Sequence, residues 1–306
     1  MALRPIDNAL PTTPERPKKQ AKLSIPIQTQ KKPSDFGVNE ENKASPLPPP
    51  PPPPADASVD YISSEKLKPF EDPESKIQGL VEGLESKDWV KVCESLNDVR
   101  RFSLHHSTVL LPILEKVMLI LVKAMNNPRS ALCKTSIMAA SDIFNAFGEK
   151  LLDFTDSGAF DRLLLQLLLK ASQDKKFVCE EADKSLKSMV NTIAPLPLLN
   201  KLSGYVNHGN LRVRAKAAVS ISNSVSKMGV DEIKEFGLVK LLQMATGSLN
   251  DRLPEAREAA RSIVFSVYKA FTENEDENPG EAWQSFCQSS LSPIQAQSII
   301  KAVGSQ

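Results

Sequence analysis

Apolar residues recur at helical spacing through most of the chain from Pro73 onward, and short polar stretches separate the apolar stripes. In the segment that starts at Asp88, the residues Val92, Leu96 and Val99 follow one another at steps of four and three. Asp88 precedes this stripe at an N-cap position, where its side chain can accept a hydrogen bond from a free amide of the first turn. Alternation of period two is almost absent, so the pattern predicts an all-α fold.

The expected helices come in pairs, and a short polar loop joins the two members of each pair. Gly and Pro lie mostly at the boundaries of these segments and not inside them. The predicted pairs are 74–84 with 88–102, 107–124 with 130–147, 160–171 with 176–193, 195–206 with 211–227, 237–245 with 254–272, and 281–289 with 292–303.

The second helices of the pairs share a repeated register. Its apolar positions are separated by 40, 46, 35 and 43 residues, and they are Val92, Leu132, Val178, Val213 and Ala256. Four residues later the chain has mostly small side chains, which let neighbouring helices approach closely: Leu96, Ser136, Ala182, Ala217 and Ala260. A repeated helix pair of about 40 residues is typical of HEAT and armadillo proteins. The sequence therefore predicts an α-solenoid of about six helix pairs over residues 73–304.

The N-terminal part of the chain has a different composition. Fourteen of the 23 prolines fall within residues 1–60, where aromatic residues are few and no apolar period is sustained. Such a segment cannot bury enough apolar surface to offset the entropy lost on ordering. We therefore expect residues 1 to about 70 to form a disordered, Pro-rich arm.

This arm carries two kinds of short motif. The prolines from Pro48 to Pro54 favour a polyproline II helix, which profilin, SH3 or WW-type grooves can bind, although a stiff spacer explains the run equally well. Thr13 and Ser45 each precede a proline and are candidate sites of proline-directed phosphorylation, Ser45 being the poorer match.

Charge and hydropathy exclude several classes of partner. The net charge is +1, so the chain has no overall field that would attract nucleic acid or an anionic membrane. The longest apolar run, residues 163–169, is interrupted by Gln166 and is far too short to span a membrane. The first residues lack the apolar core of a secretory signal. We expect a cytoplasmic protein that binds neither nucleic acid nor membrane.

No catalytic or metal-binding motif is evident. The four cysteines, Cys93, Cys133, Cys179 and Cys287, lie far apart without a CxxC motif, which indicates reduced, buried thiols and no metal site. The sequence also lacks the P-loop, dinucleotide-binding, zinc-protease and nucleophile-elbow motifs. Its three histidines form no evident triad with a nucleophile. We therefore expect no enzymatic activity and no cofactor.

The loops within the pairs carry the strongest functional signal. In a solenoid these loops emerge along one edge. Each of the five loops that follow the first helices ending at residues 84, 124, 171, 206 and 245 contains or adjoins a Lys or Arg. An aromatic anchor beside spaced cations is typical of protein-binding hot spots, and this edge would suit an acidic protein surface. The candidate residues are Trp89, Lys91, Arg129, Lys175, Lys176, Arg212 and Arg252. The alternatives are that the charges only solvate helix ends and that Trp89 packs on its own first turn.

The Trp-bearing first loop and the helix after it resemble a TOG domain, a HEAT-repeat array that binds tubulin. The third pair, residues 176–190, resembles the TOG array regulators of axonemal microtubules and, more distantly, the cytoplasmic linker-associated proteins. The resemblance covers the whole predicted solenoid. It implies that the intra-pair loops contact tubulin, that Trp89 packs against β-tubulin, and that the protein localises to microtubules and regulates their organisation or dynamics. The chain departs from the family in having a single such domain and in having Val90 and Val92 after the Trp, with Lys91 as the nearest basic residue.

Two other functions fit the same pattern. A HEAT-repeat adaptor would bind a peptide or helix in its concave face through polar ladders on the inner helices. Alternatively, the Pro-rich arm would be the functional part and the solenoid its scaffold. The placement of the cations in the loops favours the tubulin-binding interpretation over both.

Overall fold

The computed structural model describes residues 61–154, 157–273 and 278–304. All of these residues belong to one compact unit, Ala55–Gln306. The predictions for the arm up to residue 60, including the run from Pro48 to Pro54 and the phosphorylation candidates Thr13 and Ser45, therefore lie outside the described residues.

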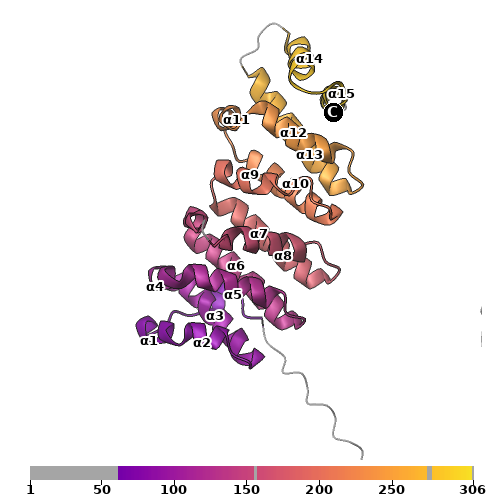
Figure 1. Cartoon of the computed structure of the whole chain (residues 1–306). Coiled ribbons are helices and arrows are strands. Elements are labelled where there is room, and N and C mark those ends of the chain that lie inside the picture. The colour runs from indigo at the N-terminus through magenta and orange to yellow at the C-terminus, as the bar shows by residue number, and fades with distance from the viewer. Residues whose placement is uncertain (1–60, 155–156, 274–277, 305–306) are drawn as a thin grey trace, which may run out of the picture. The chain divides into compact units, whose positions relative to one another are not determined.

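The described residues form helices and no strands, so the prediction of an all-α solenoid is confirmed (Figure 1). The first members of the pairs are α2 (Leu80–Leu84), α5 (Leu114–Met125), α7 (Ala159–Lys170), α9 (Pro195–Ser203), α12 (Leu238–Leu249) and α14 (Pro279–Ser290). The second members are α3 (Trp89–His105), α6 (Ser130–Phe147), α8 (Lys176–Thr192), α10 (Leu211–Val225), α13 (Pro254–Thr272) and α15 (Pro293–Gly304). Shorter elements are η1 (Ser64–Lys66), α1 (Pro73–Gln78), α4 (Ser107–Leu110), η2 (Leu111–Ile113), η3 (Gly148–Asp153) and α11 (Val230–Phe236).

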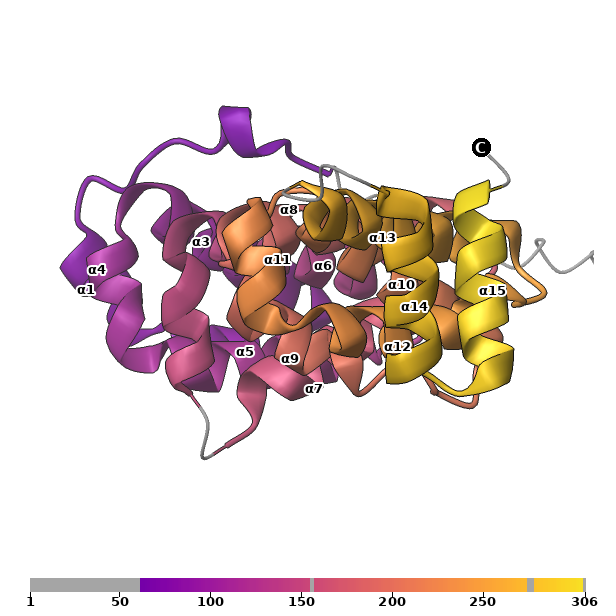
Figure 2. The same ribbon diagram turned by 90° about the horizontal axis from the view of Figure 1, so that it is seen from above.

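The pairs stack in two layers. Within the second-helix layer, α3 packs against α6, α6 against α8, α8 against α10, α10 against α13, and α13 against α15. Figure 2 shows α3, α6 and α8 on one side of the stack and α5, α7 and α9 on the other. Each pair thus buries its apolar face between its neighbours, as expected for a HEAT-type array.

The small residues of the repeated register explain how the second helices pack so closely. Ser136, Ala182, Ala217 and Ala260 have no exposed surface at all. The apolar residues four positions earlier, among them Val178 and Val213, are buried as well. A larger side chain at these positions would force α3, α6, α8, α10 and α13 apart, because packed interiors contain few voids.

Several first-layer helices differ from the sequence prediction. Residues 74–84 form two helices that meet at Gly79, and residues 107–124 are divided into α4, η2 and α5 around Pro112, which has no amide hydrogen to donate. The helix α11 lies between the predicted segments 211–227 and 237–245, where no helix was predicted, and it meets α12 at Gly237, whose φ is 104°. Such a backbone conformation is accessible mainly to glycine, so the sharp connection depends on it.

Residues 61–70, which we call the N-terminal strap, were predicted to belong to the arm, but they pack against the solenoid. Leu67 is 3% exposed, and its carbonyl oxygen lies 2.7 Å from Nε2 of His105. The backbone N–H of Phe70 donates to Nε2 of His106, and the Phe70 ring lies 4.8 Å from the ring of Phe102. These contacts join residues that are far apart in the sequence, so no local periodicity in the strap predicts them.

A buried ion pair fastens the strap to two helices. Arg100 on α3 donates through Nε to Asp142 on α6 at 2.7 Å, and the two side chains are 1% and 5% exposed. The same guanidinium donates to the carbonyl oxygen of Ile62 at 2.7 Å and to Oγ of Ser64 at 3.1 Å. Ser64 in turn donates to Asp142 at 2.8 Å. Burial of these charges is tolerated because each has several hydrogen-bond partners.

Candidate functional site

The loops within the first five pairs lie next to one another along one edge of the stack. These loops, which we call the loop edge, comprise residues 85–88, 126–129, 171–175, 204–210 and 250–253 together with the first turn of each following helix. In Figure 1 the loops before α8, α10 and α13 lie along the right-hand side of the stack. Side-chain contacts link each loop to the next, so the arrangement predicted from the repeat is present.

The first two loops meet at Trp89. The guanidinium of Arg129 lies 4.9 Å from the centre of the Trp89 ring, which is a cation–π contact. The Trp89 side chain is only partly buried and packs against the core on one side. Part of the Trp89 ring therefore packs against the core and part of it remains exposed at the loop edge.

A small cavity of about 170 Å³ with a mixed lining adjoins Trp89. Leu84, Val92 and Ile120 contribute apolar surface, and Glu85, Lys87 and Lys123 contribute charged groups. A pocket of this size beside an aromatic side chain can accept a single apolar side chain from a binding partner.

The second, third and fourth loops are joined by polar contacts. Lys175 donates through Nζ to Oγ of Ser130 at 3.1 Å. Arg212 donates to Asp174 at 2.6 Å and to the carbonyl oxygen of Ser172 at 3.2 Å. The hydrogen bond to Asp174 raises the pKa of Arg212 above its usual value. Each contact joins residues separated by 38 to 45 positions, about one repeat.

The fourth and fifth loops are joined by a more buried ion pair. Arg214 donates to Asp251 at 3.2 Å, and the Asp251 side chain is 1% exposed. Arg214 also donates to the carbonyl oxygen of His208 at 2.8 Å, and Arg257 donates to the carbonyl oxygen of Asp251 at 2.8 Å. The Arg214–Asp251 pair joins the fifth loop to the fourth, the other two contacts brace each loop on its own helix, and the sequence predictions included none of them.

A similar local hydrogen bond lies at the start of, or just before, four of the five second helices. In each case an Asp or Asn side chain accepts a hydrogen bond from the backbone N–H two residues later, at 2.9 to 3.0 Å. The donors and acceptors are Val90 to Asp88, Arg129 to Asn127, Arg212 to Asn210, and Leu253 to Asp251. Asp88 and Asn210 are the N-cap residues of α3 and α10, whereas Asn127 and Asp251 lie two residues before the N-caps of α6 and α13 and accept from the N–H of the N-cap residue.

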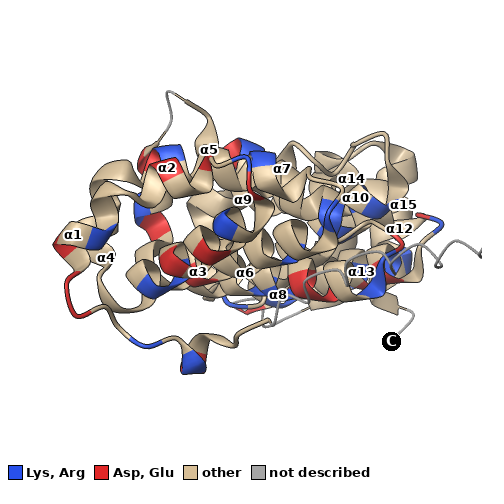
Figure 3. Cartoon of the chain, turned by 90° about the horizontal axis from the view of Figure 1, so that it is seen from below, with Lys and Arg blue, Asp and Glu red and all other residues tan. Residues whose placement is uncertain are grey.

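The predicted site residues separate into two groups. Lys91 and Arg252 are exposed, and no hydrogen bond or ion pair of their side chains is found within the described part of the chain. Lys176 is 89% exposed and lies 3.7 Å from Glu180, which is a weak surface pair. In contrast, Lys175 and Arg212 are engaged with the neighbouring loop. Around α10, α12 and α13, Lys and Arg are interspersed with Asp and Glu (Figure 3).

One further loop residue was not among the predicted site residues. Phe177, next to Lys176 at the start of α8, is 40% exposed. Its position outside the apolar stripe of α8, where Val178 and Ala182 are buried, was the available signal.

The described cysteines are mostly buried. Cys93, Cys133 and Cys287 are buried and Cys179 is partly buried, and burial raises the pKa of Cys93 and of Cys287 to about 11. The part of the chain that the structure describes contains no group of three His, Cys, Asp or Glu side chains arranged for a metal ion. None of its helices is long and apolar enough to cross a membrane.

Comparisons with known proteins agree with this architecture. The chain is 28% identical over 213 residues to TOG array regulator of axonemal microtubules protein 1 of Mus musculus, a match that covers 68% of this chain and 12% of that protein. It is 30% identical over 138 residues to the Homo sapiens protein of the same name, covering 45% of this chain and 8% of the relative. The chain therefore corresponds to a small part of the length of these relatives.

Solved structures show the same fold. A structure of crescerin, which uses a TOG domain array to regulate microtubules in the primary cilium, has a TM-score of 0.54 at 13% identity and covers 74% of this chain and 88% of its own. A structure from work on TOG–tubulin binding specificity has a TM-score of 0.53 at 11% identity, with coverages of 75% and 82%. The N-terminal domain of MAST/Orbit has a TM-score of 0.50 at 16% identity, with coverages of 78% and 100%.

The predicted resemblance to a TOG domain is thereby confirmed for the fold. The sequence profile of the family described as CLASP N terminal matches residues 99–279, which is more than half of the chain. This protein is a TOG-type HEAT-repeat protein and belongs to the CLASP N-terminal family.

Proposed function

We propose that this protein binds tubulin through the loop edge and thereby regulates the organisation or dynamics of microtubules in the cytoplasm. The family membership and the names of the relatives support this function, since the relatives are called regulators of axonemal microtubules. The observation that carries the proposal is the continuous set of contacts from Trp89 to Asp251, which holds the five loops side by side.

The loop edge has the features that an acidic protein surface requires. Trp89 and its neighbouring pocket offer an anchor at one end, and exposed cations continue from there along the edge. A partly desolvated aromatic side chain contributes contact area, while exposed cations steer an acidic partner towards it. The partner must be extended and anionic, because the exposed cations are distributed over several repeats.

The individual residues have different proposed roles. Lys91, Lys176 and Arg252 would contact tubulin directly, because they are exposed and at most weakly paired among the described residues. Trp89 would pack against tubulin, and its cation–π contact with Arg129 would hold the ring in position. Two further loop residues would mainly hold the loops in register, namely Lys175 and Arg212.

We also propose that the function is binding and not catalysis, which accords with the family. The HEAT-repeat adaptor remains a second hypothesis, in which a partner occupies the face formed by the second helices. The N-terminal strap already covers part of that face over α3 and α6. The loop edge, in contrast, is open. We place the tubulin-binding unit at residues 61–304, so that it includes the strap.

The experiment that tests this proposal is a titration of purified tubulin with fluorescently labelled protein. Trp89→Ala should cost about 2 kcal/mol or more of binding free energy, as expected for an aromatic anchor. Because Trp89 also packs on the core, the circular dichroism and thermal unfolding of the Trp89→Ala variant must be measured alongside its binding. Arg252→Glu provides a second variant, because this exposed side chain makes no contact among the described residues on which folding depends. Arg252→Glu should weaken tubulin binding. The control Lys269→Glu, at the far end of α13, should not. The proposal is wrong if wild-type protein does not bind tubulin, or if Arg252→Glu and Lys269→Glu have equal effects.

A further inference from the structure

The last helix pair has a surface feature that the loop edge does not explain. Ile294, at the start of α15, is 79% exposed, more than the other large apolar side chains among the described residues. It lies at one end of a groove of about 470 Å³ between α15 and the end of α12 with α13. At the rim of a groove, this side chain offers apolar surface that a bound partner would remove from water.

The pair that carries Ile294 is firmly packed and is not a loose end. Trp283 on α14 is 2% exposed, and its ring lies 5.2 Å from that of Tyr268 and 5.5 Å from that of Phe271 on α13. On α15 itself, Ala296 and Ile299 are buried against the stack. The exposure of Ile294 therefore reflects its position on the outer face of a well-anchored helix.

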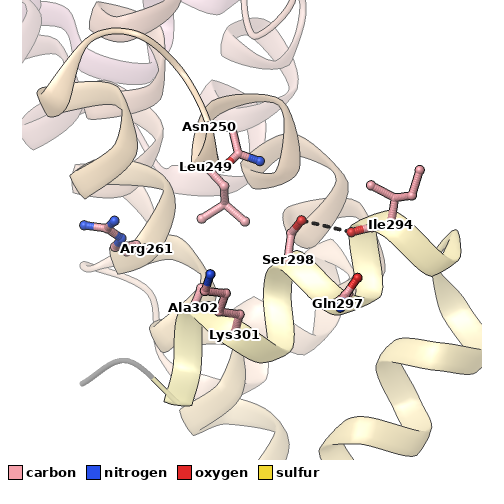
Figure 4. A pocket seen from close by; sticks show the side chains of 8 residues that line it. All are labelled: Leu249, Asn250, Arg261, Ile294, Gln297, Ser298, Lys301 and Ala302. Atoms are coloured by element: carbon pink, nitrogen blue, oxygen red, sulfur yellow. Dashed lines mark hydrogen bonds between the residues drawn. The ribbon is translucent and has the colours of Figure 1, made fainter.

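The groove has an apolar end and a cationic end. Figure 4 shows Ile294 on one side, Arg261 and Lys301 towards the other, and Leu249 between them. None of the described residues that line it is Asp or Glu. Ser298, also in the lining, is satisfied within its own helix, because its hydroxyl donates to the carbonyl oxygen of Ile294 at 2.9 Å. The groove thus favours a ligand that is both apolar and anionic.

The groove can be contacted from both of its sides. Arg261 lies on α13, across the groove from Ile294 on α15. A peptide that contacts both residues must carry an apolar side chain for Ile294 and a carboxylate for Arg261.

The groove is continuous with the loop edge. Asn250, which lines it, immediately precedes Asp251 and Arg252 of the fifth loop, and Gln295 donates to Thr246 on α12 at 3.5 Å. From these observations we propose that the groove between α13 and α15 binds an acidic peptide segment through one apolar side chain that contacts Ile294 and one carboxylate that contacts Arg261. This second binding site is separate from Trp89 and does not require that the loop edge bind tubulin.

A short fluorescein-labelled peptide tests the proposal by fluorescence anisotropy. The probe has one leucine, two glycines and then three glutamates, and a second probe has glycine in place of the leucine. The full-length protein should bind the leucine probe about tenfold more tightly than the glycine probe, because only the former can occupy the Ile294 end. Both Ile294→Glu and Arg261→Glu should weaken binding of the leucine probe by about tenfold.

Matched controls come from the same helix. Phe265 is 46% exposed on α13 and Lys269 lies one turn further, and neither lines the groove. Phe265→Glu and Lys269→Glu should leave peptide affinity within about twofold of wild type, as surface changes away from the contact do. Trp89→Ala should also leave it unchanged, whatever that substitution does to tubulin binding. The proposal is overturned if the leucine probe does not bind, if both probes bind equally, or if the control substitutions weaken binding as much as Arg261→Glu.

Discussion

At the scale of single residues, the structure shows that several charged side chains bind other parts of the same chain. Arg100 is the extreme case, since its guanidinium is 1% exposed and joins α3, α6 and the N-terminal strap. The sequence places Arg100 directly after Val99 of the apolar stripe, but it does not predict which residues Arg100 contacts. Asp142 lies 42 residues away and Ile62 lies 38 residues away, and no local pattern relates them.

Removing Arg100 should destabilise the protein severely. Arg100→Ala leaves the Asp142 carboxylate buried without its cation and releases the strap, so the free energy of unfolding should fall by about 3–5 kcal/mol. Urea denaturation followed by circular dichroism measures this change. Lys116→Ala is the control, because its pair with Glu85 is more than half exposed and should contribute less than about 1 kcal/mol. An equal loss in the two variants would show that the buried pair does not stabilise the strap.

The cysteines provide a second prediction at this scale. Burial raises the pKa of Cys93 and Cys287 to about 11, above the ordinary value of 9.0, so their thiolates form only as the pH rises towards 11. At pH 8 we expect a thiol reagent such as DTNB to modify Cys179, which is partly exposed, before the other three. Mass spectrometry of the modified protein identifies the site. Modification of native Cys93 as fast as Cys179 would contradict the buried, protonated state.

At the scale of elements, the second helices were predicted more accurately than the first helices. The bounds of α6 and α13 agree with the prediction, and α8 differs by one residue at its end. These helices are long and have a clear apolar stripe. The first-layer segments are interrupted, at Gly79 between α1 and α2 and at Pro112 within η2, and these breaks depend on how each short piece packs. Periodicity indicates that a helix exists, but it does not show where packing divides it.

Gly148, which ends α6, tests the importance of such a connection. Its φ of 51° and ψ of −122° are accessible mainly to glycine, and a Cβ there would lie 2.8 Å from the carbonyl oxygen of Thr192. Gly148→Ala should therefore lower the free energy of unfolding by about 1–3 kcal/mol, with a fall in melting temperature. Gly158→Ala is the matched control, because its φ is 60° but no atom lies within 4 Å of the added Cβ. Gly148→Ala should lower the free energy of unfolding more than Gly158→Ala does. The reverse order would contradict the close approach of residue 148 to the carbonyl oxygen of Thr192.

At the scale of the whole molecule, the repeat predicted which loops share an edge, and the structure places them there. Which cations are paired among the described residues and which have no partner there could not be predicted, because the pairing depends on acidic residues about one repeat away. Arg212 is paired with Asp174 and Arg214 with Asp251, whereas Lys91 and Arg252 have no such partner within the described part of the chain. The residues expected to meet a partner are therefore fewer than the cations that the loops contain.

The most direct measurement of the central proposal is the salt dependence of tubulin affinity for two triple variants. One reverses exposed cations at the loop edge, Lys91→Glu, Lys176→Glu and Arg252→Glu, and the other reverses exposed cations elsewhere, Lys187→Glu, Lys240→Glu and Lys269→Glu. The two variants have equal net charge. The loop-edge variant should bind at least about tenfold more weakly than wild type and lose most of the salt dependence, whereas the control should keep both. Equal weakening by the two variants would mean that the attraction is diffuse and that the loop edge is not the tubulin-binding site.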